Sequence, residues 1–364
     1  MTIDPSIKEE IAQAKKNISQ LNAFVGFDGF IDKIVAPVDK VDYESHTRTL
    51  IPTISDFAQR IGSAAGKSSN IELAEKLNKL GGNGPIMANA QLALGLSVRY
   101  IGALGAPDIH PLFKEFSQNT QAISLSDPGV THALEFEDGK VMLGTMQSLQ
   151  AICYENLIDT IGAQKLSQIL DQADAISMVN WTMLNHLTDL FRSLIQNILP
   201  QLSRKKIFFF DLADPEKRTD ADILEVLELL KNFEAFGKVI LGLNYRESSQ
   251  VARLLDLDLQ ETDLSLRAQA IKDTLNINCV VIHPVESAHC ASDEGAFSLI
   301  GPYCEKPKIT TGGGDHFNAG FVSAKLLGLS DPAALAVAVS TSGYYVRNAE
   351  SPSYDAIIDF VNAY

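Results

Sequence analysis

Residues 310–315, Thr-Thr-Gly-Gly-Gly-Asp, place three consecutive glycines before an acid, and a helical pattern follows at once. Glycines free the backbone to turn successive N–H groups toward one point. A helix start adds unpaired N–H groups and the positive end of its dipole, so this segment could cradle a phosphate. Asp315 would repel phosphate, but it could accept the proton of an alcohol that attacks phosphate. The alternative is a glycine turn followed by an ordinary helix cap.

Two acids, Asp28 and Asp32, follow the first predicted strand at 23–26. Acids at the carboxyl end of a strand are well placed for a ligand in an open α/β sheet. Their carboxylates could accept hydrogen bonds from sugar hydroxyls. A polar turn with surface acids is the competing interpretation.

A second glycine pair, Gly81-Gly82, precedes Asn83 and lies between two predicted helices. It could be the glycine end of a helix. It could also be a backbone platform on which a small polyol lies closely, with Asn83 offering amide hydrogen bonds.

Asn244 and Glu247 follow another predicted strand, at 239–243. Three residues apart at a helix start, they lie on one face and fit a capping box. A carboxylate there could also hold the waters of a Mg²⁺ ion that rides on nucleotide phosphates. Both interpretations can hold together.

The composition bounds the function. The 364 residues hold 30 lysines and arginines against 45 aspartates and glutamates, a net charge of −15. This argues against nucleic acid or an anionic membrane as the main partner. Four scattered cysteines without a CxxC pair indicate reduced thiols in a cytoplasmic protein. No apolar run reaches the length of a membrane span, and the first residues do not resemble a signal peptide.

Apolar runs typical of strands alternate with helical patterns, which predicts one α/β domain over residues 1–364, with a mostly parallel sheet and helices on both faces. A helix is expected at 71–80, since its apolar residues recur at helical spacing. The buried strands are expected at 23–26, 98–101, 175–179, 207–210, 239–243 and 279–282.

Two stretches, 33–52 and 131–147, alternate like antiparallel strands instead, and Asp138-Gly139 is a good hairpin turn. Short strands set apart from a parallel sheet could form a small lid. The unpaired edges of such a lid favour a homodimer that forms through it.

These pieces occur in an order that resembles the ribokinase-like (PfkB) family of carbohydrate kinases. Residues 310–321 look like its Asp-Thr-x-Gly-Ala-Gly-Asp-x-Phe-x-x-Gly signature, and residues 81–105 match more loosely. The resemblance spans most of the chain from about residue 22. It implies the ribokinase-like fold and transfer of a phosphoryl group from ATP, carried with Mg²⁺, to a hydroxyl of a small sugar or related alcohol.

The resemblance also implies roles by matched position. Asp315 would be the base, beside an anion hole of Gly312, Gly313 and Gly314. Glu247 would place the Mg²⁺ ion. The nucleotide would contact Asn244, Thr310, Thr311, Gly312 and Gly314. The sugar would contact Asp28, Asp32, Gly81, Gly82 and Asn83.

The chain differs from the family at two places. Ile309 stands where the family has an acid that helps a monovalent cation bind, so the resemblance leaves cation dependence open. Residues 283–288 lack both glycines of the family's Thr-x-Gly-x-x-Gly near the nucleotide. A lost nucleotide pocket would leave a non-catalytic sugar- or nucleotide-binding regulatory protein as the rival. A weaker alternative is a nucleoside kinase, and the sequence does not choose the sugar.

Overall fold

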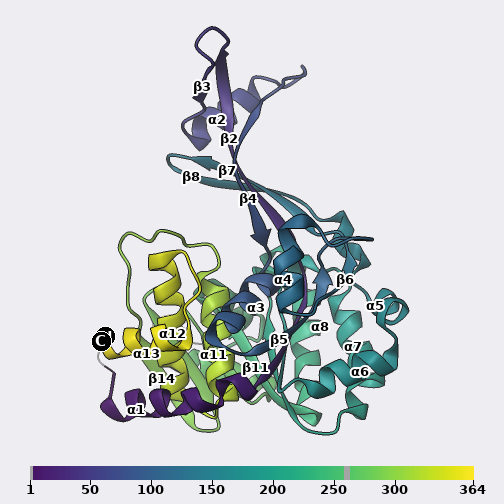
Figure 1. The fold of residues 1–364 in the computed structure, drawn as a ribbon, viewed down its shortest axis with the longest axis vertical. Coiled ribbons are helices and arrows are strands. Elements are labelled where there is room, and N and C mark those ends of the chain that lie inside the picture. Colours follow the sequence, from purple (N-terminus) through teal and green to yellow (C-terminus); the bar gives the residue numbers. More distant parts are fainter. Residues whose placement is uncertain (1–2, 258–262) are drawn as a thin grey trace.

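The computed structural model describes residues 3–257 and 263–364. Over these residues an α/β body carries a second sheet that projects from one end (Figure 1). The body's sheet has nine described strands in the order β14-β13-β12-β11-β10-β9-β1-β5-β6. The strands are β1 (Asn22–Phe27), β5 (Ser97–Ala103), β6 (Ile123–Ser126), β9 (Ala175–Met178), β10 (Lys206–Asp211), β11 (Gly237–Leu243), β12 (Cys279–Ile282), β13 (Ser287–Ser292) and β14 (Gly295–Ile300).

The strands from β6 to β12 pair in parallel, and β13 and β14 complete the sheet as an antiparallel hairpin that the sequence analysis did not anticipate. The six predicted strands are all present, which confirms the predicted fold class. Because the carboxyl ends of parallel strands share one edge of a sheet, the loops after β1, β10, β11 and β12 meet there.

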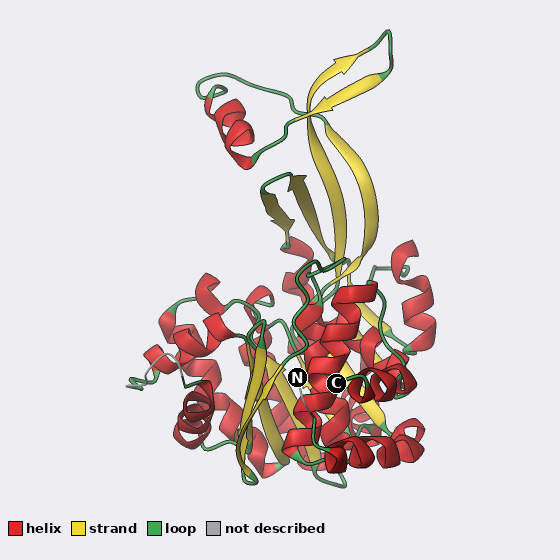
Figure 2. Ribbon diagram, turned by 90° about the vertical axis from the view of Figure 1, so that its left-hand side faces the viewer, coloured by secondary structure: helices red, strands yellow, loops and turns green. Residues whose placement is uncertain are grey.

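Helices cover both faces of this sheet (Figure 2). One core cluster joins the sheet to α5 (Tyr154–Ile161), α6 (Ala163–Gln172), α7 (Leu187–Asn197), α8 (Asp220–Leu230), α9 (Tyr245–Leu254) and α10 (Leu264–Leu275). The other joins it to α1 (Pro5–Ala14), α3 (Asn83–Leu94), α4 (Lys114–Asn119), α11 (Gly313–Leu326), α12 (Asp331–Asn348) and α13 (Tyr354–Asn362). The strand period of two is visible in β10, where Phe208 and Phe210 enter the first cluster and Phe209 the second.

The projecting sheet follows the order β3-β2-β7-β8, with β4 paired to the other side of β2. The 13-residue strand β2 extends from the body into the projecting sheet, where β3, β4 and β7 pair with it (Figure 1). Phe57 of the neighbouring helix α2 packs on Phe136 of β7, with ring centroids 5.3 Å apart. The elements are β2 (Phe30–Asp42), β3 (Thr47–Leu50), α2 (Ile54–Gly62), β4 (Leu73–Gly81), β7 (Gly129–Phe136) and β8 (Gly139–Thr145).

The helix expected at 71–80 is wrong: this segment is the strand β4, antiparallel to β2. Its apolar residues recur at helical spacing, but Leu73 and Leu77 remain 39% and 51% exposed. The spacing therefore reflects exposed apolar surface on an edge strand, and pairing with β2 overrides the local pattern. The pair Gly81-Gly82 consequently joins a strand to a helix, which excludes the expected helix end.

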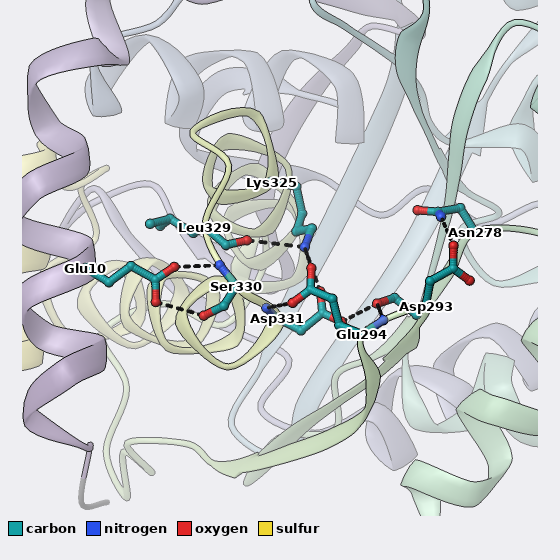
Figure 3. Close-up of polar contacts among 9 residues, drawn as sticks. Glu10, Asn278, Asp293, Glu294, Lys325, Leu329, Ser330 and Asp331 are labelled. Atoms are coloured by element: carbon teal, nitrogen blue, oxygen red, sulfur yellow. Dashed lines mark hydrogen bonds and ion pairs between the residues drawn. The ribbon is translucent and has the colours of Figure 1, made fainter.

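A polar network at the far end of the body joins α11 to α12 (Figure 3). Lys325 in the last turn of α11 donates to Asp331 at 2.7 Å and to Glu294 of the β13–β14 turn at 3.0 Å. Glu10 of α1 accepts hydrogen bonds from the backbone N–H of Ser330 at 2.6 Å and from its hydroxyl at 2.8 Å. The network joins the C-terminal end of α11 to α12 and to the β13–β14 turn, and the N-terminal end of α11 carries the glycine bend.

Candidate active site

The glycine bend lies where the sequence analysis placed a helix start. Gly312 is the N-cap of α11 with φ +91°, and a Cβ there would lie 3.1 Å from the Tyr345 hydroxyl. The N–H of Gly313 donates to the Thr310 carbonyl at 3.2 Å. In the described part of the chain, no acceptor bonds the N–H of Gly312 or Gly314, and no side chain caps the helix. Two of the three predicted donors are thus available to an anion.

Asp315 is half-buried in the first turn of α11. Burial raises its pKa well above the ordinary value, and the nearby carboxylates of Asp211 and Asp28 raise it further. A hydrogen bond from the Asn83 side chain acts in the opposite direction. The structure therefore brings the predicted base together with the predicted sugar-contacting residues Asn83 and Asp28.

Asp28 lies fully buried after β1 and is engaged by protein donors on both oxygens. The backbone N–H groups of Asn83 and Gly84 donate to it at 2.9 and 2.8 Å, and the Asn180 amide at 2.6 Å. Burial raises its pKa to about 6 against the lowering effect of these bonds. Asp28 thus fixes the start of α3, and direct contact with a sugar remains a prediction.

Asp32 is the more available of the two acids. It lies on β2 next to the end of β4, and a Cβ at Gly81 would come within 2.4 Å of its carboxylate. Within residues 3–257 and 263–364 no hydrogen-bond donor engages that carboxylate, and burial raises its pKa while Lys79 lowers it. Glycine at position 81 is needed for this close approach, and Gly82 likewise approaches the carboxylate of Asp28.

Asn244 and Glu247 form the predicted capping box at the start of α9. The Asn244 side chain accepts from the N–H of Glu247 at 3.0 Å, and Glu247 accepts from the N–H of Asn244 at 2.8 Å. The second Glu247 oxygen accepts from the N–H of Asp214 at 2.9 Å. The role of Glu247 toward a metal remains a prediction, since no group of three potential ligands in the described residues is arranged to hold an ion.

A cavity of about 360 Å³ lies beside the glycine bend. Asn244, Thr310, Gly313 and Gly314 line it, whereas Thr311 and Gly312 lie outside its lining and Thr311 is exposed. His283 also lines it, with a ring nitrogen that is buried and has no hydrogen-bond partner among the described residues. The segment after β12 therefore forms one wall of an open pocket, although it lacks the glycines of the family pattern. The lining also includes apolar residues, among them Val285, Pro302, Val339 and Val346.

Asp211 was not among the site residues predicted from the sequence. It ends β10, is 7% exposed, and accepts hydrogen bonds from the Asn318 side-chain amide at 2.6 Å and from the backbone N–H of Ala213 at 2.8 Å. Burial and the charge of Glu247 raise its pKa to about 8. The signal was present, because an acid directly after a predicted buried strand is the pattern that selected Asp28.

A parallel sheet whose carboxyl edge joins an open glycine helix start, a carboxylate and a nucleotide-sized cavity, beneath a projecting sheet, has the architecture of a ribokinase-like carbohydrate kinase. The chain belongs to the prokaryotic ketohexokinase family, whose sequence model matches residues 4–364. The protein is thus a carbohydrate kinase, a phosphotransferase with an alcohol group as acceptor.

Individual relatives agree. The ketohexokinase of Haloferax volcanii is 29% identical over 342 residues, covering 93% of this chain and 90% of that protein. The fold is similar to that of fructokinase with bound ATP from Xylella fastidiosa, with a TM-score of 0.65, 12% identity and coverage of 94% and 98% of the two chains. It is similar to Arabidopsis thaliana ribokinase complexed with ribose and ATP, with a TM-score of 0.64, 13% identity and the same coverage. No helix among the described residues is both long and apolar enough to cross a membrane.

Proposed function

We propose that this kinase transfers the γ-phosphoryl group of ATP to a primary hydroxyl of a ketohexose. The observation that carries the proposal is the open start of α11, where Gly313 and Gly314 line the cavity and the buried Asp315 carboxylate follows in the same turn. The substrate class follows the name of the Haloferax volcanii relative.

In this mechanism Asp315 accepts the proton of the attacking hydroxyl. Its raised pKa makes it a stronger base than a surface carboxylate, so it acts above that pKa. The N–H groups of Gly312 and Gly314 bond the oxygens of the transferring phosphoryl group, where charge accumulates in the transition state. Asp32 accepts a hydrogen bond from a sugar hydroxyl, and Asn83 orients Asp315.

The nucleotide occupies the cavity along Asn244 and Thr310, with its base against the apolar lining. The carboxylates of Asp211 and Glu247 suit Mg²⁺, since their mutual repulsion raises the pKa of Asp211 and a cation would relieve it. Glu247 would hold the ion through water, because its oxygens already accept backbone N–H groups. When bound, Mg²⁺ neutralises phosphate charge during transfer.

The projecting sheet is proposed to be the lid of a single ribokinase-like domain over residues 1–364. Its base carries Asp32, so closure over the sugar would exclude water and suppress hydrolysis of ATP.

The same sheet is proposed to join two copies of the chain. Leu77, Ile34, Ala133 and Met142 lie opposite one another on four adjacent strands and form an apolar row. Leu77 and Met142 are 51% and 54% exposed, which favours cover by a second copy. Light scattering should give twice the chain mass for the wild type and the chain mass for Leu77→Asp with Met142→Asp; a wild-type monomer would contradict the dimer.

The test of function is a phosphorylation screen with ATP and Mg²⁺. Ketohexoses, aldohexoses, pentoses, sugar phosphates and nucleosides are each supplied, ADP release is followed, and the phosphorylated position is read by ³¹P NMR. The proposal expects the highest kcat/KM with a ketohexose. Preferred turnover of nucleosides would support a nucleoside kinase, and binding of sugar or ATP without any turnover would support the non-catalytic alternative.

A further inference from the structure

Two stacked rings lie behind the glycine bend. The rings of His316 and Tyr345 have centroids 3.5 Å apart and planes 14° apart. The Tyr345 hydroxyl donates to the Thr311 carbonyl at 3.0 Å, and His316 Nδ1 bonds the Gly312 carbonyl at 2.7 Å. The Ser351 hydroxyl lies 2.8 Å from His316 Nε2. Two consecutive carbonyls of the bend are therefore tied to side chains.

The protonation states of this pair are defined by their surroundings. Burial lowers the pKa of His316 to about 4, so the ring is neutral at physiological pH. A carbonyl only accepts, so the single ring proton lies on Nδ1, and Nε2 accepts from Ser351. Burial and the charge of Asp315 raise the pKa of Tyr345 to about 12, so its hydroxyl remains a donor.

Each of these bonds to a carbonyl also orients the N–H group of the same peptide unit, which belongs to the next residue. In a planar trans peptide the C=O and the next N–H point in opposite directions. Holding the Thr311 carbonyl toward Tyr345 therefore directs the N–H of Gly312 away from the ring pair, and holding the Gly312 carbonyl does the same for Gly313. Glycines do not fix their own dihedrals. Two backbone bonds restrain the bend from within, from the Gly313 N–H to the Thr310 carbonyl at 3.2 Å and from the His316 N–H to the Gly312 carbonyl at 3.0 Å, and the two side chains add a restraint from outside it.

We propose that His316 and Tyr345 are positioning residues that hold the glycine bend in the conformation in which its N–H groups meet the transferring phosphoryl group. The proposal rests on the kinase function above and adds two residues that act on the backbone. Preorganised N–H donors contribute to catalysis only if they are already aimed when charge develops, so loosening the bend should lower kcat more than substrate affinity.

Tyr345→Phe removes one hydroxyl and keeps the ring. We expect kcat to fall about 10- to 100-fold, as for small misplacements of catalytic groups, with the KM for the sugar within about twofold of wild type. Tyr354→Phe is the matched control, because the Tyr354 hydroxyl also donates to a buried backbone carbonyl at 3.0 Å, that of Ile11, far from the site. It should leave kcat unchanged.

His316→Ala should lower kcat by a similar factor of about 10 to 100. His316→Asn retains an N–H donor near the place of Nδ1 and should recover most of that loss. Equal kcat for the Ala and Asn variants would contradict the role of the Nδ1–H donor, and wild-type kcat in both Tyr345→Phe and His316→Ala would overturn the proposal.

Amide hydrogen exchange of Gly313, the N–H of the bend that is protected by a bond to the Thr310 carbonyl, separates this proposal from the kinase function. Exchange should accelerate in Tyr345→Phe and His316→Ala, but not in Tyr354→Phe. Unchanged exchange overturns the proposal whether or not the wild type turns over. Faster exchange in the two variants, combined with a wild type that phosphorylates no substrate, would refute the kinase function while keeping the restraint on the bend.

Discussion

The adjacent helices α11 and α12 begin in opposite ways. At the start of α12, the N–H of Ser330 donates to Glu10 and that of Asp331 to Glu294, at 2.6 and 3.0 Å (Figure 3). At the start of α11 a glycine stands at the N-cap, and no side chain of the described chain caps it. The two helices pack side by side, yet one receives the protein's own carboxylates and the other does not (Figure 1).

The difference between the two helix starts follows the separate demands of stability and of ligand binding. A helix start attracts negative charge through its dipole and its unpaired N–H groups. Where the start has only to hold the fold, carboxylates from α1 and the β13–β14 turn satisfy it. Where it lines the cavity, the described part of the chain leaves it open, and the proposed function places the transferring phosphoryl group where the carboxylates lie at α12.

The largest effect should follow from Asp315→Asn. Loss of the base should lower kcat about 10²- to 10⁴-fold, the usual range for a group that moves a proton in the transition state. Steady-state assays with ATP and a ketohexose measure it, with calorimetry of ATP binding as the control for folding. An Asn variant with wild-type kcat would remove Asp315 from the mechanism.

Gly312→Ala should come next. Gly312 has φ +91°, and the new Cβ would lie 3.1 Å from the Tyr345 hydroxyl, so the bend must shift and kcat should fall about 10- to 100-fold. Gly328→Ala is the control, because Gly328 also has positive φ, +74°, but a Cβ there meets nothing within 4 Å. Both variants carry similar backbone strain of about 1–2 kcal/mol. Equal kcat in the two would show that the bend's position does not matter.

The buried acids of the site should make the ligand-free protein less stable as pH rises. Burial raises the pKa of Asp28 to about 6 and, with the charge of Glu247, that of Asp211 to about 8. Both exceed the unfolded value, so the folded state binds more protons, and the free energy of unfolding falls from about pH 4 to pH 8. Melting temperatures across this range should decline, and less steeply for Asp211→Asn. A rising profile would be inconsistent with these shifts.

The smallest effect is expected at the start of α12. Glu10→Ala removes the acceptor of both Ser330 bonds and should cost about 1 kcal/mol of unfolding free energy, as for loss of a helix cap. Because this helix start is remote from the cavity, kcat should stay at the wild-type value. Denaturant unfolding measures the loss of stability, and the kinase assay measures kcat. A large loss of kcat would contradict the expectation that the start of α12 serves stability alone.

Local patterns were sufficient for much of this molecule. Alternating apolar runs predicted the parallel sheet, and the capping box of Asn244 and Glu247 needs only residues three apart. The glycine bend was readable for the same reason, because its chemistry lies within six consecutive residues.

The remainder depends on contacts between distant segments. Strand β4 has helical spacing and becomes a strand only by pairing with β2. Tyr345 reaches the Thr311 carbonyl across 34 residues because α12 packs against α11, and nothing near Tyr345 in the sequence marks that contact. The occupation of Asp28 by backbone N–H groups likewise follows from how α3 meets β1.

The central claim is that the N–H groups of Gly312 and Gly314 receive the transferring phosphoryl group. The most direct measurement is ¹H–¹⁵N NMR of glycine- and serine-labelled protein, before and after adding Mg-ADP, fructose and aluminium fluoride as a mimic of the transferring group. The amide protons of both glycines should move downfield, as new hydrogen bonds require, while that of Ser330, already bonded to Glu10, should not move. Unmoved glycine signals in a preparation that phosphorylates fructose would contradict the account.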